Sequence, residues 1–206
     1  PKIIVGHAGS GFHIHSRLIK NGKNMIVDDS GVLNDNARKM IAGYLEMSPS
    51  LTAFGNTVPT SFLRLVPHQE APTNICWGDS NRYVLVRVTL GWRGVNDIMY
   101  KANPKETGNI PEFVNNQTVE IRSPDGSAHI YKLLAGLAMA AKYGFSNPKS
   151  LEIAKKLYVS VDVGKNQKKL NLPQLPSSCE EAAEKLVESR AIYEQDGVFP
   201  SYLIDG

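Results

Sequence analysis

Gly9-Ser10-Gly11-Phe12-His13-Ile14-His15, near the start of the 206-residue chain, is the stretch around which we organise the sequence. Its two glycines carry no Cβ, so the backbone there can turn tightly or lie against a ligand. The following residues alternate as in a β-strand, which predicts that His13, His15 and Arg17 share one face. Two imidazoles can then point into one site, although a half-exposed strand with incidental histidines has the same pattern.

The composition is that of an ordinary globular protein, with 42% hydrophobic and 21% charged residues. A formal net charge of +3 does not indicate a nucleic-acid partner. The longest apolar run, within 133–141, is interrupted by Gly136, so no membrane span is expected. The two cysteines, Cys76 and Cys179, lie far apart, which favours a reducing compartment and a cytoplasmic location over a disulfide framework.

Turn and capping residues divide the chain into strands and helices. Asn21-Gly22 predicts a hairpin turn. Asn34 can cap a helix that Ser48-Pro49 is expected to end. The alternating segments 82–88 and 118–122 are typical of strands.

The second half of the chain is dominated by helical patterns. They cover 129–145 with Gly144 near the end as a cap, 151–157, and 180–193 with a capping box between Ser178 and Glu181. Residues 91–112 are expected to be irregular and the basic run 165–169 to be a solvated loop. Strands with long helices in blocks predict an α+β fold with a largely antiparallel sheet.

Charged residues lie inside several otherwise apolar strands and tight loops. Such charges are costly unless they are paired, bind a ligand or face a polar cavity. Imidazole and carboxylate groups suit a divalent cation, and arginines suit phosphates and carboxylates. The set predicts a site for a metal-bound nucleotide and an acidic substrate, with structural ion pairs as the alternative. Its members are His13, His15, Arg64, Glu70, Arg82, Arg87, Glu120 and Arg122.

The motifs around these residues resemble the successive signatures of glutamine synthetases, in the family's order and at similar spacings. The resemblance covers the chain from Gly9 to about Gly197. The matching motifs are Gly9–His15, Arg64-Leu65-Val66-Pro67-His68-Gln69-Glu70-Ala71-Pro72, Asn81-Arg82 with Arg87, and Glu120-Ile121-Arg122-Ser123-Pro124-Asp125. The resemblance implies half of a catalytic domain of this type, with a curved, largely antiparallel sheet backed by helices.

The resemblance also implies a reaction and its participants. An ATP-dependent ligase of this kind forms glutamine from glutamate and ammonia through a γ-glutamyl phosphate intermediate, with Mg²⁺ or Mn²⁺ as the metal. The arginines and the metal would neutralise charge on the transferred phosphoryl group. The partners implied are glutamate, ammonia, ATP and further copies of the protein in a homo-oligomeric ring, with no nucleic acid and no membrane.

Roles can be carried over residue by residue onto the matching positions. His13 and Glu120 match metal ligands, and His15, Arg82 and Arg87 match groups that hold ATP, Arg82 and Arg87 also contacting the phosphoryl group in flight. Gly9, Arg64 and Arg122 match groups that bind the amino-acid substrate. Glu70 matches the glutamate of a loop that closes the site and helps to take a proton from the ammonium. Arg82 and Arg87 are five residues apart, so Arg82 is expected in the loop before the strand or beyond a bulge.

Three departures from the family pattern concern the substrates. Ala8 stands where an asparagine usually helps to hold the amino acid, Thr118 replaces a usual basic residue, and His68-Gln69 replaces a common Gly-Tyr. Two alternatives therefore stay open. One is a γ-glutamyl ligase acting on an organic amine, and the other is a non-catalytic family member.

The resemblance leads us to expect that residues 1–206 form a single partial domain, the C-terminal portion of the catalytic domain. The small β-grasp domain and the first half of the catalytic domain, which supplies further metal glutamates, have no counterpart in these residues.

We therefore expect residues 1–206 alone to form little or no glutamine from glutamate, ammonia and ATP. The reason is that the second metal site and the wall supplied by a neighbouring subunit would be absent. A coupled assay of phosphate release and glutamine measures this, and clear ATP-dependent glutamine formation by these residues alone would contradict it.

Overall fold

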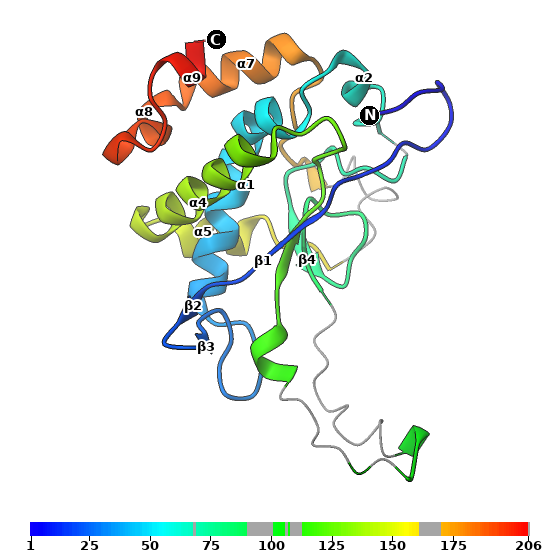
Figure 1. Ribbon diagram of the computed structural model, residues 1–206, viewed down its shortest axis with the longest axis vertical. Coiled ribbons are helices and arrows are strands. Elements are labelled where there is room, and N and C mark those ends of the chain that lie inside the picture. The colour runs from blue at the N-terminus through cyan, green and yellow to red at the C-terminus, as the bar shows by residue number, and fades with distance from the viewer. Residues whose placement is uncertain (68, 90–100, 106, 108–112, 161–169, 206) are drawn as a thin grey trace.

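The computed structural model describes residues 1–67, 69–89, 101–105, 107, 113–160 and 170–205. The helices α1 and α4 lie side by side on one side of the strands, and α7 to α9 lie beyond one end of this layer (Figure 1). The α-helices are α1 (Asp35–Gly55), α2 (Pro59–Phe62), α4 (Ile130–Ser146), α5 (Ser150–Lys156), α7 (Cys179–Glu188), α8 (Arg190–Tyr193) and α9 (Tyr202–Asp205). The 3-10 helices are η1 (Phe113–Asn116) and η2 (Gln195–Gly197). The strands are β1 (Ile14–Ser16), β2 (Ile19–Lys20), β3 (Lys23–Asn24), β4 (Trp77–Asp79), β5 (Val86–Val88) and β6 (Val119–Ile121).

The main sheet is mixed and has the order β1-β6-β5-β4. The pairs β1–β6 and β6–β5 are antiparallel, whereas β5–β4 is parallel. The expectation of a largely antiparallel sheet is therefore corrected to a mixed one, and its curvature stays a prediction. The hairpin of β2 and β3 turns at Asn21 and Gly22, both with positive φ, as the dipeptide predicted.

The parallel pair is unusual because only residues 80–85 connect its two strands. Parallel strands ordinarily need a crossover of about a dozen residues or more. Here each strand has three residues, so the chain has to return only about 10 Å, which six residues can cover. The reversal starts at Ser80, whose φ is +52°, and its N–H donates to the Val88 carbonyl at 2.9 Å.

Helix α1 continues through Pro49, contrary to the expected stop at Ser48-Pro49. Proline removes the N–H that would bond to the carbonyl of Leu45. The hydroxyl of Ser48 donates to that same carbonyl at 2.7 Å, so the acceptor is satisfied and the helix continues. At the start of the helix the predicted cap is confirmed, because the Asn34 side chain accepts hydrogen bonds from the N–H groups of Asn36 and Ala37.

The ends of the later helices differ from the expectation in three ways. Helix α4 runs past Gly144 to Ser146 and ends at Asn147. The segment 180–193 forms two helices that meet at Ser189. Ser178 caps α7 as predicted, but the Glu181 carboxylate accepts from the N–H of Ser177 at 2.8 Å rather than closing a box on Ser178.

The core lies between the helices and the apolar face of the sheet. The alternation of each strand sends one set of side chains to this core and the other set to the opposite face. The side chains that line the core from the sheet are Trp77, Val86, Val88, Val119 and Ile121, all buried, with Ile14 partly buried beside them.

None of the helices in the described residues is long and apolar enough to cross a membrane. The expected basic loop 165–169, and most of the irregular segment 91–112, lie outside the described residues.

Helices α1 and α4 cross at two glycines. A Cβ placed on Gly43 would lie 2.0 Å from the Ala140 carbonyl oxygen, and one on Gly144 would lie 2.1 Å from that of Lys39. Because both obstacles are backbone atoms, neither can move aside as a side chain could. Gly144 is therefore required for helix packing rather than for capping.

We predict that Gly43→Ala lowers the free energy of unfolding by about 1–3 kcal/mol or more, because the added methyl group forces the two helices apart. Urea denaturation followed by circular dichroism measures this. Gly126→Ala is the control, since Gly126 is exposed and the nearest atom to its added Cβ lies at 3.8 Å. Equal stability of the Gly43→Ala variant and the parent chain would show that the crossing is not tightly packed.

Candidate active site

One row of residues crosses the face of the sheet that points away from the helices. The register pairs His15 with Glu120, Glu120 with Arg87, and Arg87 with Gly78. Directly opposed residues point to the same face of a sheet, so this register collects ionisable side chains from three strands. The two-residue spacing of the histidines and of Glu120 with Arg122 predicted such a shared face.

Glu120 is the centre of this row, and its residue is only 1% exposed. Its Oε1 lies 2.7 Å from Nδ1 of His13, and its Oε2 accepts a hydrogen bond from Nε of Arg87 at 2.5 Å. Nε of Arg122 and Nε2 of His15 lie 3.8 and 3.9 Å from Oε1. The structure therefore brings four of the predicted site residues together around the carboxylate of a fifth, Glu120.

These contacts decide the ionisation of the group. Burial alone raises the pKa of a carboxyl group, but hydrogen bonds from His13 and Arg87, with the charge of Arg87, outweigh it. The pKa of Glu120 consequently lies below its ordinary value of 4.5. Burial, together with the neighbouring Arg87, lowers the pKa of Arg122, while Glu120 acts in the opposite direction.

A cavity of about 130 Å³ lies next to this row. It joins the glycine-containing stretch at the start of the chain to the loop that carries Glu70, two segments about sixty residues apart in the sequence. His13 is part of both the cavity and the row around Glu120, because it lines the cavity and also bonds to Glu120. The residues lining the cavity are Ala8, Gly9, Gly11, His13, Arg64, Gln69, Glu70 and Ala71.

Arg64 is buried beside the cavity and is held by backbone carbonyls. Its Nη1 donates to the carbonyl of Ser123 at 2.7 Å and its Nη2 to that of Arg122 at 3.2 Å. Burial lowers the pKa of Arg64, partly offset by nearby carboxylates. A Cβ on Gly11 would lie 2.6 Å from Nη2 of Arg64 and 2.8 Å from Nε2 of His13, so a larger residue there would displace the ends of both side chains.

Asn56 and Asp125 support Arg64 from behind. The Asn56 amide donates to the Ser123 carbonyl at 3.0 Å and to Oδ2 of Asp125 at 3.1 Å. Oδ1 of Asp125 accepts hydrogen bonds from the N–H and the hydroxyl of Ser127. Sequence reasoning missed Asn56. No signal in the sequence pointed to it, because the helix was expected to end at Ser48-Pro49, whereas Asn56 follows the observed end of α1 at Gly55.

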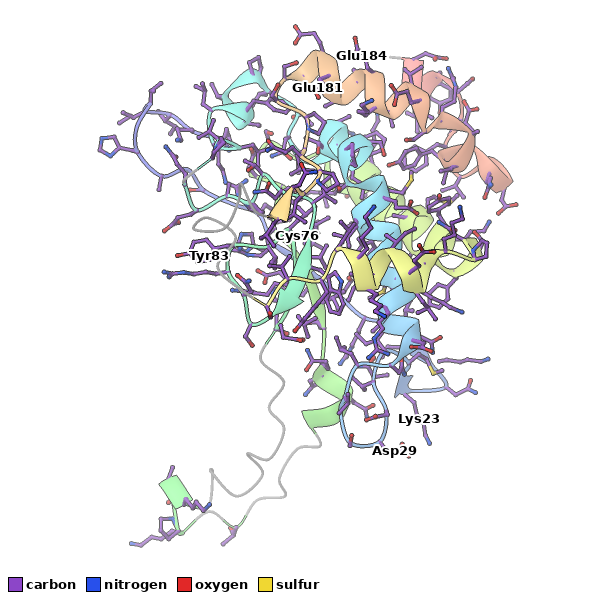
Figure 2. All side chains as sticks on the ribbon, turned by 180° about the vertical axis from the view of Figure 1, so that it is seen from behind. Lys23, Asp29, Cys76, Tyr83, Glu181 and Glu184 are labelled. Atoms are coloured by element: carbon purple, nitrogen blue, oxygen red, sulfur yellow. The ribbon has the colours of Figure 1, made fainter. Side chains whose placement is uncertain are left out.

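Arg82 differs from the other predicted residues. It lies in the turn before β5, as its spacing from Arg87 suggested, and its carbonyl accepts a hydrogen bond from Arg122. Its guanidinium lies over the ring of Tyr83, 5.3 Å from the centroid. The side chain of Tyr83 lies on the side of the molecule away from α1, α4 and α5 (Figure 2). The structure thus brings the Arg82 backbone to the site while its guanidinium contacts Tyr83.

The donor types at this place, an imidazole and a carboxylate, are ones that a divalent cation takes from protein. His13 and Glu120 present a nitrogen and a carboxylate oxygen to each other. Among the residues described, no group of three or more His, Cys, Asp or Glu side chains is placed to hold a metal ion. Mg²⁺ commonly uses one or two carboxylates and takes its other ligands from water and phosphates. The pair would suit that arrangement.

The comparisons of this chain with known proteins agree on one family. Residues 1–206 match the family described as "Glutamine synthetase, catalytic domain". The chain is 34% identical over 213 residues to a glutamine synthetase of Mycolicibacterium smegmatis, which covers all of the chain and 39% of that protein. It is 32% identical over 198 residues to one of Pyrococcus abyssi, covering 96% of the chain and 40% of that protein. The chain thus spans about two fifths of the length of these curated relatives.

A solved structure supports the fold independently. The Plasmodium falciparum glutamine synthetase determined by cryo-electron microscopy superposes with a TM-score of 0.71 at 19% sequence identity. The superposition covers the whole chain and 44% of that structure. At this identity the likeness concerns the fold.

We predict that Glu120→Gln lowers the free energy of unfolding at pH 7 by about 3 kcal/mol, because it removes the buried carboxylate that pairs with the guanidinium groups of Arg87 and Arg122. The folded pKa of Glu120 is depressed, so its contribution is complete above pH 4.5 and is lost as the pH falls through the folded pKa. The variant should therefore lose less stability than the parent chain between about pH 5 and pH 3.

Urea denaturation at a series of pH values measures this difference. Glu188→Gln is the matched control, because Glu188 is 62% exposed and pairs with Lys185 at the surface, where such pairs contribute little. Parallel pH profiles for the Glu120→Gln variant and the parent chain would contradict the assignment.

Proposed function

Because the chain belongs to the glutamine synthetase catalytic-domain family, a family of glutamate–ammonia ligases, we propose that the longest natural chain containing it forms glutamine from glutamate, ammonia and ATP. The observation that carries the proposal is the position of His13. It contacts the cation-rich row around Glu120 on one side and the cavity with Arg64 and Glu70 on the other. A site for a metal nucleotide and a site for an acidic substrate would then share one side chain.

Each of the site residues would bind the part of the substrates that suits its charge. Arg87, and Arg82 after rotation of its side chain, would bind ATP phosphates, and His15 would lie beside them. Arg64 and Arg122 would bind the carboxylates of glutamate, and Gly9 would let the amino acid lie against the backbone. Fixed guanidinium groups stabilise charge that develops during transfer of the γ-phosphate to the substrate carboxylate.

A divalent cation held by His13 and Glu120 would neutralise phosphate charge when bound. Glu70 would take a proton from the incoming ammonium, and the loop that carries it would exclude water from the γ-glutamyl phosphate. Free Cys76 and Cys179 agree with a cytoplasmic location, and the resemblance favours a homo-oligomeric ring.

A second function is favoured by one observation. Ala8 lines the cavity, where the family usually has an asparagine, so this wall offers a methyl group rather than an amide. Because that asparagine helps to hold the amino acid in the family, its replacement leaves open which acid and which amine the site would join. Comparison of ammonia with ethanolamine and polyamines as acceptors, in the longest natural chain, separates a glutamine synthetase from a γ-glutamyl ligase. A non-catalytic member would use neither.

We predict that the longest natural chain containing residues 1–206 binds Mg-ATP and that His13→Ala and Arg87→Ala each weaken binding about tenfold or more. Each substitution removes a group expected to act on phosphate or metal, and hydrogen bonds to charged groups contribute about 1.5–3 kcal/mol. Isothermal titration calorimetry measures binding, and a glutamine assay on the same samples measures activity.

Arg38→Ala is the control, because Arg38 pairs with Asp35 on helix α1. Absence of Mg-ATP binding by a folded parent protein would overturn the proposed function. Binding that neither site substitution weakens would overturn the assignment of these residues.

A further inference from the structure

Lys2 is a buried cation close to the loop that carries Glu70. It is only 2% exposed, whereas a lysine is almost never fully buried unless it is paired. Its backbone N–H donates to the carbonyl of Thr60 at 3.1 Å, and this bond holds the segment beside α2 (Figure 1). The preceding carbonyl, that of Pro1, lies against Gly9, because a Cβ on Gly9 would lie 3.2 Å from its oxygen. Lys2 is therefore next to the wall of the cavity.

The ammonium group of Lys2 has one hydrogen-bond acceptor within the part of the chain that the structure describes. It donates to Oε1 of Gln69, and no ion pair in that part includes it. A buried charge is costly unless polar groups replace the water that it loses. Hydrogen bonds to charged groups are also stronger than those between neutral groups. Among the described residues, Gln69 is therefore the group on which this ammonium depends.

Gln69 directly precedes Glu70 and lines the cavity with it. No backbone hydrogen bond among the described residues joins 69–72 to another segment, so side chains hold this part of the loop. After Glu70 the loop is attached by Ala71, which is buried in a small apolar cluster with Phe62 of α2. Before Glu70 it is attached by the hydrogen bond of Gln69. Glu70 itself is exposed, so its position depends on these two attachments.

The attached loop brings the carboxylate of Glu70 within electrostatic reach of two arginines. Burial lowers the pKa of Arg64 and that of Arg122, and the negative charge of Glu70 opposes this effect at both. Loss of the attachment at Gln69 would let the exposed carboxylate move away from these guanidinium groups. It would also let water reach the cavity from the side of the loop.

We propose that Lys2 is a positioning residue of the site, and that its hydrogen bond to Gln69 holds the loop 69–72 at the cavity. It would act through Glu70, which takes a proton from the ammonium under the proposed function, and through the exclusion of water. This inference rests on the proposed function and adds a residue to it. With the loop released, water in place of ammonia would break the γ-glutamyl phosphate, giving glutamate and phosphate but no glutamine.

The test uses Lys2→Met and Gln69→Met in the longest natural chain containing these residues. Methionine is similar in length to both side chains, but it has no charge and no N–H, and its sulfur is only a weak acceptor. We expect each variant to release about twofold or more phosphate per glutamine formed and to raise KM for ammonia about threefold or more, with Mg-ATP affinity unchanged. The double variant should be no worse than either single variant, because both remove the same bond. Lys2→Arg, which keeps a charged donor, should release less phosphate per glutamine than Lys2→Met.

Lys156→Met is the control, because Lys156 is exposed on α5 and does not line the cavity. Unchanged phosphate release per glutamine in the folded Lys2→Met and Gln69→Met variants, with an active parent protein, overturns this inference and leaves the proposed function standing. A parallel loss of Mg-ATP affinity also overturns it, because the substitutions would then disturb the whole site. If the Lys2→Met variant does not fold, the Gln69→Met variant decides between these outcomes. Absence of ATP-dependent glutamine formation by the folded parent protein overturns the proposed function and this inference with it.

Discussion

The ion pairs of Glu120 tie the fold of this chain to its chemistry. A carboxylate that is almost wholly buried is costly unless cationic or hydrogen-bonding partners surround it. Here the partners come from different segments of the chain, His13 from just before β1 and Arg87 from β5. A slip of one residue in β6 would send Glu120 into the apolar core and Val119 onto the charged face. The register that buries the apolar side chains is thus the one that assembles the charges.

Helix α1 is connected to the same site by Asn56, the residue that follows its end. Helix α1 is held against α4 by the close approach of backbone at Gly43, and it ends at Gly55. Asn56, the next residue, bonds to the Ser123 carbonyl, and that carbonyl also accepts from Arg64. The position of the Arg64 guanidinium therefore depends on the packing of α1, because Asn56 at the end of that helix holds the carbonyl to which Arg64 donates. Rigid elements position the arginine, and the loop that carries Glu70 lies against it.

The sequence allowed the grouping of charged side chains on one sheet face to be predicted more fully than the ends and pairing of the helices and strands. A spacing of two in a strand fixes a shared face by geometry alone, so the grouping of His13 with His15 and of Glu120 with Arg122 could be predicted. Pro49 could not be placed correctly, because its effect depends on whether Ser48 turns its hydroxyl back to the helix. The parallel pairing of β4 with β5 depends on a left-handed residue at Ser80, a position where the sequence offers no glycine. The direction of the Arg82 side chain depends on a contact with Tyr83.

The balance of charge on the site face explains why these residues suit an anionic ligand. Two guanidinium groups, those of Arg87 and Arg122, lie within 4 Å of the single carboxylate of Glu120. Nε of Arg122 is buried without a hydrogen-bond partner in the described part of the chain. Glu120 thus fixes the positions of the arginines without cancelling their charge. A ligand with several negative charges would neutralise the remaining charge of these arginines. By mass action its binding would also stabilise the folded chain.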